Sequence, residues 1–129
     1  MATEKEILNN IARHLGYRIN SYVKRADGYT PKMNEDFEYF YRWYSEDMYK
    51  IQLFLKYYRK LKEVVNEENL KDVLNFLKGE VERIEKRLLE SQLHQSSSSQ
   101  ASNIAFVFEL EVEQQMRQEY LSMIHNIEL

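Results

Sequence analysis

The strongest constraint on the fold is an uninterrupted helical repeat in the middle of the chain. Large apolar side chains recur there in alternating steps of four and three residues, which places them on one face of an α-helix as a heptad seam. A second apolar line follows another side of the same segment, so the helix is apolar over more than one stripe. This pattern predicts a long central helix at about residues 31–65 that is buried or interfacial. The seam consists of Phe37, Tyr41, Tyr44, Met48, Ile51, Leu55 and Tyr58, and the second line of Phe40, Trp43, Leu53, Phe54, Tyr57, Leu61 and Val64.

A helix is expected before this segment and another after it. Thr3 and Glu6 form a capping box, and apolar residues follow at helical spacing as far as Val23. The stretch 27–31 contains Asp-Gly and Thr-Pro and predicts a turn, with Thr30 capping the central helix and Pro31 at its first position. Asn69 is a good cap for a third helix, which runs from Leu70 to about Leu88.

The last segment has two interpretations. Residues 108–113 alternate between apolar and acidic residues, which taken alone is typical of a strand. Read as a helix from about Asn103, the segment places apolar residues on one side as far as the C-terminus. We predict the helix, because no second convincing strand exists to pair with the first, and keep a short strand near 106–112 as the alternative. The apolar side is formed by Ile104, Phe108, Val112, Met116, Tyr120, Ile124 and Ile127.

The composition favours one all-α domain. The chain has 129 residues but only 3 Gly and 1 Pro, so there are few places at which long helices would break. One hydrophobic core is enough for a chain of this length. Residues 91–102 include four consecutive serines and are interpreted as a flexible connection. The sequence therefore predicts a single helical bundle of about four helices spanning residues 1–129.

Composition also restricts the compartment and the chemistry. Without cysteine there is no disulfide framework and no thiolate ligand or nucleophile. No apolar run approaches the length needed to cross a bilayer, and the N-terminus lacks the apolar stretch of a secretory signal. We therefore expect a cytoplasmic protein with no membrane partner.

The net charge of −3 is distributed unevenly. Residues 1–62 carry 12 Lys and Arg against 8 Asp and Glu, a balance of +4, whereas residues 63–129 carry 6 against 13, a balance of −7. The two halves could attract each other within one bundle, or the first could offer a basic face to nucleic acid.

No catalytic or cofactor-binding constellation is recognisable. His14, His94 and His125 are not spaced as metal ligands, so we expect no metal site. The serines lack the glycine-framed turn of a nucleophile elbow, and there is no glycine-rich phosphate loop. The sequence therefore nominates no catalytic residue and no cofactor, and an enzyme is not the favoured interpretation.

One short motif gives a weaker alternative. Arg87 and His94 are separated by six residues, and this spacing resembles the Arg-x(4 to 6)-His motif of HEPN-fold ribonucleases, which are also helical bundles. The resemblance implies that the two residues would stabilise charge and transfer protons at an RNA phosphate. It covers eight residues only, and Leu88 stands where that family usually has a polar residue.

The leading hypothesis is a non-enzymatic interaction subunit that packs against itself or against a larger protein assembly. Aromatic residues are favoured at protein interfaces, and the central helix carries many of them. The predicted partner-binding residues are Tyr41, Trp43, Tyr44, Phe54, Tyr57 and Tyr58. The alternative is a small subunit of a ribonucleoprotein or defence complex that binds RNA or single-stranded nucleic acid. In that role the Lys and Arg side chains would contact phosphates, and the aromatic rings would stack on unpaired bases. The residues predicted for that role are Arg42, Lys50, Lys56, Arg59 and Lys60.

Overall fold

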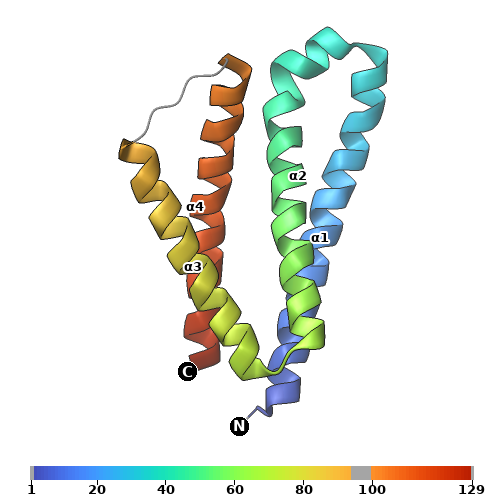
Figure 1. Ribbon diagram of the computed structural model, residues 1–129. Coiled ribbons are helices and arrows are strands. Elements are labelled where there is room, and N and C mark those ends of the chain that lie inside the picture. The colour runs from blue at the N-terminus through green and yellow to red at the C-terminus, as the bar shows by residue number, and fades with distance from the viewer. Residues whose placement is uncertain (1, 94–99, 129) are drawn as a thin grey trace.

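The computed structural model describes residues 2–93 and 100–128, and within them the chain forms four α-helices and no strand. They are α1 (Glu4–Glu35), α2 (Phe37–Glu67), α3 (Leu70–Leu93) and α4 (Gln100–Glu128), shown in Figure 1. The predicted all-α bundle of four helices is confirmed. The alternative strand at 106–112 is wrong, because those residues lie inside α4. Of the predicted connection 91–102, the two ends belong to α3 and α4, and 94–99 lie outside the described residues.

Two helix starts agree with the predicted caps. The hydroxyl of Thr3 accepts a hydrogen bond from the amide of Glu6 at 3.2 Å. The side-chain oxygen of Asn69 accepts one from the amide of Asp72 at 2.9 Å. Each cap satisfies an amide that has no partner within its own helix, which is why these polar residues fix where α1 and α3 begin.

The boundary between α1 and α2 differs from the prediction. The chain does not turn at 27–31, because α1 continues through Pro31 and ends at Glu35. The break is at Asp36, whose backbone is extended and whose carboxylate accepts the amide of Tyr39 at 3.1 Å. The long helix therefore begins at Phe37 rather than at 31. A proline removes only one helical hydrogen bond, and contacts of neighbouring side chains with α2 hold the last turns of α1 in place.

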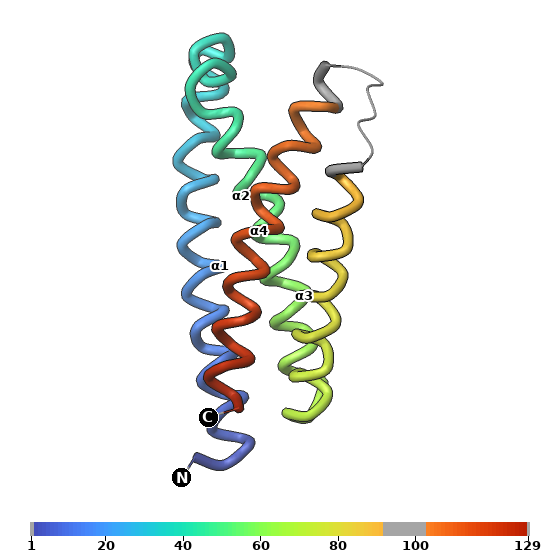
Figure 2. Tube along the Cα trace, turned by 90° about the vertical axis from the view of Figure 1, so that its left-hand side faces the viewer, coloured from blue at the N-terminus to red at the C-terminus, as the bar shows by residue number. Residues whose placement is uncertain are grey.

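The helices form two antiparallel hairpins. α1 packs along α2, and α3 packs along α4, while α2 also lies against α4. The hairpins meet most closely toward the end that holds both termini and the short α2–α3 link (Figure 1). Seen from the side, α4 moves away from the α1–α2 hairpin toward the opposite end (Figure 2). The turn between α1 and α2 consequently forms a free end of the molecule.

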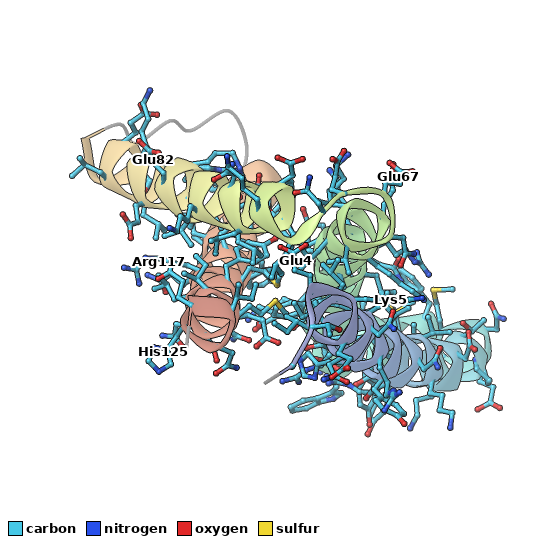
Figure 3. The ribbon with its side chains drawn as sticks, turned by 90° about the horizontal axis from the view of Figure 1, so that it is seen from below. Glu4, Lys5, Glu67, Glu82, Arg117 and His125 are labelled. Carbon is cyan, nitrogen blue, oxygen red and sulfur yellow. The ribbon has the colours of Figure 1, made fainter. Side chains whose placement is uncertain are left out.

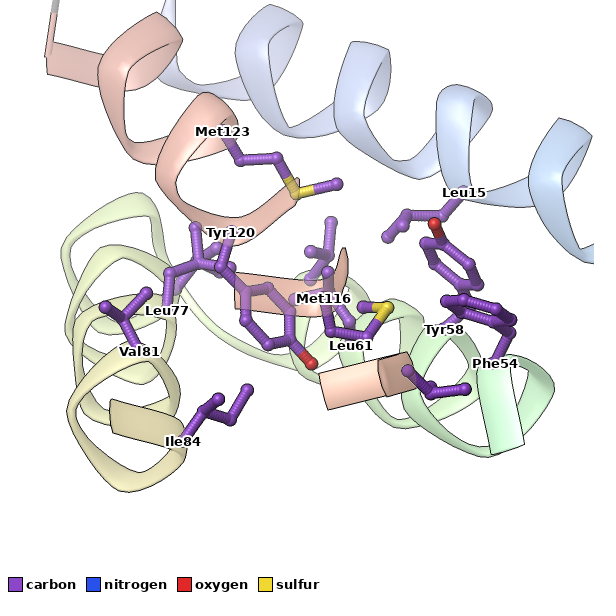
Figure 4. Close-up of a cluster of buried hydrophobic side chains, with 13 residues drawn as sticks. Leu15, Phe54, Tyr58, Leu61, Leu77, Val81, Ile84, Met116, Tyr120 and Met123 are labelled. Carbon is purple, nitrogen blue, oxygen red and sulfur yellow. The ribbon is translucent and has the colours of Figure 1, made fainter. Parts of the chain in front are cut away.

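The main core lies where the four helices converge (Figure 4). Seen from below, polar side chains such as Glu82, Arg117 and His125 point outward from α3 and α4 (Figure 3). A smaller cluster, formed by Ala26, Ile51 and Leu55, joins α1 to α2 nearer to the turn between these two helices. The buried residues of the main core are Leu15, Phe54, Tyr58, Leu61, Val65, Val73, Leu77, Val81, Ile84, Val112, Met116, Tyr120 and Met123.

Candidate functional site

Aromatic side chains gather at the free end of the α1–α2 hairpin. We call this group the aromatic tip. Its outer members are large and well exposed: Phe37 is 61% exposed, Tyr39 52%, and Tyr41 and Trp43 65% each. A monomeric soluble protein rarely leaves a contiguous apolar surface of this kind uncovered. The aromatic tip comprises Tyr29 from α1 and Phe37, Tyr39, Phe40, Tyr41, Trp43 and Tyr44 from α2.

The tip has its own small interior. Phe40 is only 5% exposed, and its ring lies 6.3 Å from that of Tyr29 in an edge-to-face arrangement. Tyr29 also contacts Tyr44, with 5.2 Å between ring centroids. On the outside, the rings of Phe37 and Tyr41 are 6.1 Å apart. Such ring pairs add stability beyond the area they bury, so the inner rings form a support for the outer ones.

Polar contacts fix α1 to α2 just below the tip. The guanidinium of Arg25 and the hydroxyl of Tyr29 both donate to the carboxylate of Asp47. Partial burial opposes ionisation of Asp47, but the hydrogen bonds from Tyr29 and Arg25 outweigh it and lower the pKa of this carboxyl. The ammonium of Lys32 also lies 4.9 Å from the centre of the Tyr44 ring, a cation–π contact. These contacts between α1 and α2 therefore stabilise the part of the hairpin that carries the aromatic tip.

The first turns of α2 follow a different direction from the rest of the helix. Figure 1 shows them crossing the top of the molecule before α2 descends beside α1. At this point the hydroxyl of Ser45 donates to the carbonyl oxygen of Tyr41. A serine that bonds back to the carbonyl four residues earlier often bends a helix. The bend presents residues 37–43 at the end of the molecule.

One side of the tip contains a shallow recess of about 230 Å³. Tyr39 and Trp43 provide its apolar part, and Glu38 and Arg42 its charged part. The last two form an ion pair of 3.4 Å in which both side chains are mostly exposed. The recess is smaller than the usual pocket for a small molecule, which occupies roughly 300–1,000 Å³. It suits a single protein side chain.

The six predicted partner-binding residues divide into two groups. Tyr41, Trp43 and Tyr44 belong to the aromatic tip, and the first two are exposed. Phe54 and Tyr58 are 7% and 3% exposed and are part of the main core, so the folded chain does not offer them to a partner. The sixth, Tyr57, is partly buried and donates a hydrogen bond inside the bundle.

The five predicted nucleic-acid-binding cations also divide. Arg42 is paired with Glu38, and Lys50 contacts both Glu46, at 2.8 Å, and Glu111 of α4. The remaining three are exposed, and no ion pair to them occurs within the described part of the chain. These are Lys56 and the adjacent Arg59 and Lys60, which follow it by three and four residues and therefore share a face of α2.

The middle of the bundle contains a buried carboxylate that was not predicted from the sequence. Glu113 of α4 is fully buried. One of its oxygens accepts from Arg87 of α3 at 2.7 Å and from the hydroxyl of Tyr57 of α2 at 2.9 Å. Its other oxygen has no partner within the described residues. Burial and the hydrogen bond to Glu113 raise the pKa of Tyr57, which therefore stays protonated as a donor.

Arg87, the first residue of the HEPN-like motif, therefore has a role within the fold. Its guanidinium contacts Glu113 and, at 3.0 Å, also Glu109 of α4. A group held by two carboxylates is poorly placed to take an RNA phosphate. His94, the second residue of the motif, lies outside the described residues.

A second recess runs along the side of the bundle between α1 and α4, with a volume of about 440 Å³. Ile11 and Met123 line its apolar part. Glu119, another lining residue, lies 3.1 Å from His14 and 3.8 Å from Arg18, so its carboxylate already has partners within the recess. Nothing in its chemistry selects a particular ligand.

Within residues 2–93 and 100–128, no group of three or more His, Asp or Glu side chains is arranged so that it could hold a metal ion. None of the helices described combines the length and apolarity required to cross a membrane. The chain matches no protein-family model, and comparisons with curated proteins and with solved structures found no similar protein.

Proposed function

We propose that the protein is a non-enzymatic helical interaction subunit that binds a protein chain through its aromatic tip. The observation that carries the proposal is the exposure of four large aromatic side chains within seven residues of α2, each more than half exposed. Burying such surface is the main driving force of protein association. Tyr and Trp are also enriched among the residues that contribute most to interface affinity.

The support beneath the tip strengthens the proposal. Phe40 and Tyr29 pack under the outer rings, and Asp47 ties the two helices together. A surface that is already ordered loses little conformational entropy when it binds, so more of the contact energy appears as affinity. The tip is also clear of the α3–α4 hairpin, which leaves a partner free to approach it (Figure 2).

Site-specific photo-crosslinking tests this function. A photoreactive amino acid replaces Tyr41 in one variant and Lys60 in a second. The two positions are comparable because both are exposed and lie on the same helix. We expect a crosslink to a protein from position 41 and none from position 60. A product of twice the chain mass of 15.7 kDa identifies a second copy, and any other mass identifies a different protein. Equal crosslinking from both positions, or none from 41, contradicts the proposal.

A nucleic-acid-binding role is the second candidate, and it rests on the three exposed cations of α2 at 56, 59 and 60. Cations that are not neutralised by the protein can release counterions from a phosphate backbone, which makes binding depend steeply on salt. The aromatic rings nearest to these cations, Tyr57 and Tyr58, are directed into the bundle rather than toward a strand of nucleic acid. The role predicts a complex with single-stranded RNA that weakens as salt is raised, measured by fluorescence anisotropy.

A further inference from the structure

We infer that the occupant of the recess on the aromatic tip is a second copy of this chain, paired antiparallel through residues 36–43. This inference rests on the proposed function and specifies its partner. In the resulting two-fold dimer, Trp43 of each chain enters the recess of the other. The recess is formed by Asp36, Glu38, Tyr39, Arg42 and Trp43.

The residues of the recess are self-complementary. Glu38 and Arg42 are four residues apart, as are Tyr39 and Trp43, so each pair occupies one face of the helix. When two such segments run antiparallel, residue 38 of one chain lies near residue 42 of the other, and residue 39 near residue 43. The midpoints of the two pairs are residues 40 and 41, about 1.5 Å apart along the helix. A single two-fold axis between them therefore leaves each pair only about 1.5 Å from direct opposition, a shift that these long side chains can span. Isologous pairing of this kind is the commonest form of homodimer.

Charge selects the antiparallel arrangement over the parallel one. Antiparallel pairing places Glu38 of each chain beside Arg42 of the other, which makes two attractive contacts. Parallel pairing places Glu38 beside Glu38 and Arg42 beside Arg42, which is repulsive. Among the described residues, Glu38 and Arg42 form ion pairs only with each other, at 3.4 Å, and their side chains are 84% and 66% exposed. An exposed pair of this kind holds its partners weakly, so both remain available to a second chain.

The size of the contact sets its strength. A stable interface usually takes 20–30 residues from each side. The segment 36–43, which includes the exposed Phe37 and Tyr41, is much shorter. The dimer is therefore expected to form reversibly and to dissociate on dilution. Its affinity depends mainly on the aromatic contact, and its orientation depends on the charges.

Sedimentation equilibrium from micromolar to millimolar protein tests the arrangement through a charge swap. Arg42→Glu makes positions 38 and 42 acidic in both chains, and Glu38→Arg makes them basic, so each single variant should dimerise at least about tenfold more weakly than the wild type. The double variant restores one charge of each sign and should regain wild-type affinity. An equimolar mixture of the two single variants should form a heterodimer. Lys60→Glu, a charge reversal on α2 away from the tip, is the matched control and should dimerise normally.

The circular dichroism spectrum of every variant shows whether it is folded, and the substituted side chains are exposed. A wild type that stays monomeric up to millimolar concentration overturns the dimer. So does a dimer that ignores both single substitutions, or a folded double variant that does not regain affinity. If the wild type is monomeric while position 41 still crosslinks to another protein, the self-pairing fails and the proposed function stands. If the wild type is monomeric and position 41 crosslinks to no protein, both the self-pairing and the proposed function are wrong.

Discussion

Arg87 of α3 and Glu113 of α4 form an ion pair of 2.7 Å in which the glutamate side chain is buried and the arginine side chain is about one-third exposed. The two residues are 26 positions apart in the sequence and come from different helices of one hairpin. Tyr57 of α2 completes the contact from the other hairpin. The pair therefore joins three helices at a single carboxylate.

Removing the arginine of this ion pair should destabilise the fold. Arg87→Met leaves Glu113 buried without its closest cation, and the unfolding free energy should fall by about 3 kcal/mol, the lower end of the range for broken buried pairs. The lower end applies because Glu113 keeps the hydrogen bond from Tyr57. Urea denaturation monitored by circular dichroism measures the change. Arg59→Met is the control and should change stability by less than about 0.5 kcal/mol.

Replacing both members of the pair should cost much less than replacing one. The double variant Arg87→Met with Glu113→Leu removes the buried charge together with its partner, so at least half of the lost stability should return. The same urea titration provides the measurement. If the double variant is less stable than Arg87→Met alone, Glu113 is stabilised by something other than this cation.

Pro31 offers a direct test of the boundary between α1 and α2. Proline within a helix lacks the amide that would bond to the carbonyl four residues earlier, so Pro31→Ala should raise the unfolding free energy by about 2 kcal/mol. Pro31→Gly should gain about 1 kcal/mol less, because glycine loses more backbone entropy. Thermal denaturation of the three proteins gives the order. A loss of stability in Pro31→Ala would mean that the chain turns at 27–31 after all.

Two glycines within helices can be replaced without crowding. An added Cβ at Gly16 of α1 or Gly79 of α3 meets no atom within 4 Å, and neither residue has a positive φ. Each change to alanine should therefore stabilise the protein by about 0.5–1 kcal/mol. The sites are on different helices, so the two gains should add. Chemical denaturation of both single variants and the double variant checks the sum.

The buried tyrosines should make the protein sensitive to alkali. Burial raises the pKa of Tyr58 above its ordinary value of 10.0, with Glu119 and Tyr22 adding to the rise and Arg18 opposing it. Because the folded state keeps its proton longer than the unfolded state, this contribution is complete below pH 10 and is lost as the pH rises further. The loss is about 1.4 kcal/mol per pH unit for each such group. Tyr58→Phe should reduce the slope above pH 10 by that amount, as measured by urea denaturation at pH 9 to 11.5.

The outer and inner rings of the aromatic tip should behave differently on substitution. Trp43→Ser should change the unfolding free energy by less than about 1 kcal/mol, since its ring is 65% exposed. Phe40→Ala should cost about 3 kcal/mol or more, because Phe40 is buried beneath the tip. Circular dichroism on heating separates the two. Equal losses would show that Trp43 packs within the monomer, and the proposed surface would not exist.

Helical periodicity and caps were sufficient to predict the architecture. Val112, Met116 and Tyr120 recur at four-residue steps and are buried, as a helix in this segment requires. Thr3 and Asn69 begin α1 and α3 because a side-chain oxygen at a helix start is a local property, which a sequence displays directly. The turn near Pro31 was predicted wrongly for the same reason: local turn chemistry was read without the contacts that α1 makes with α2.

The site was only partly predictable because exposure depends on which helices lie alongside. Tyr41 and Tyr58 belong to the same heptad seam, yet the first is 65% exposed and the second 3%. The difference arises because α1 and α2 extend beyond the region covered by the other hairpin. The burial of Glu113 is likewise set by residues of two other helices. Its only sequence signal was the alternation with apolar residues at 108–113, which is equally typical of a strand.

The position of the termini has a practical consequence for experiments on the tip. Both described ends of the chain lie at the end of the bundle opposite the α1–α2 turn (Figure 1). α2 alone has 31 residues, a contour length of about 45 Å at the rise of an α-helix. A surface anchor, dye or fusion domain attached at either terminus is therefore held far from Trp43. Protein immobilised through a terminus would therefore present its aromatic tip to the solution, which suits single-molecule or surface-based binding measurements.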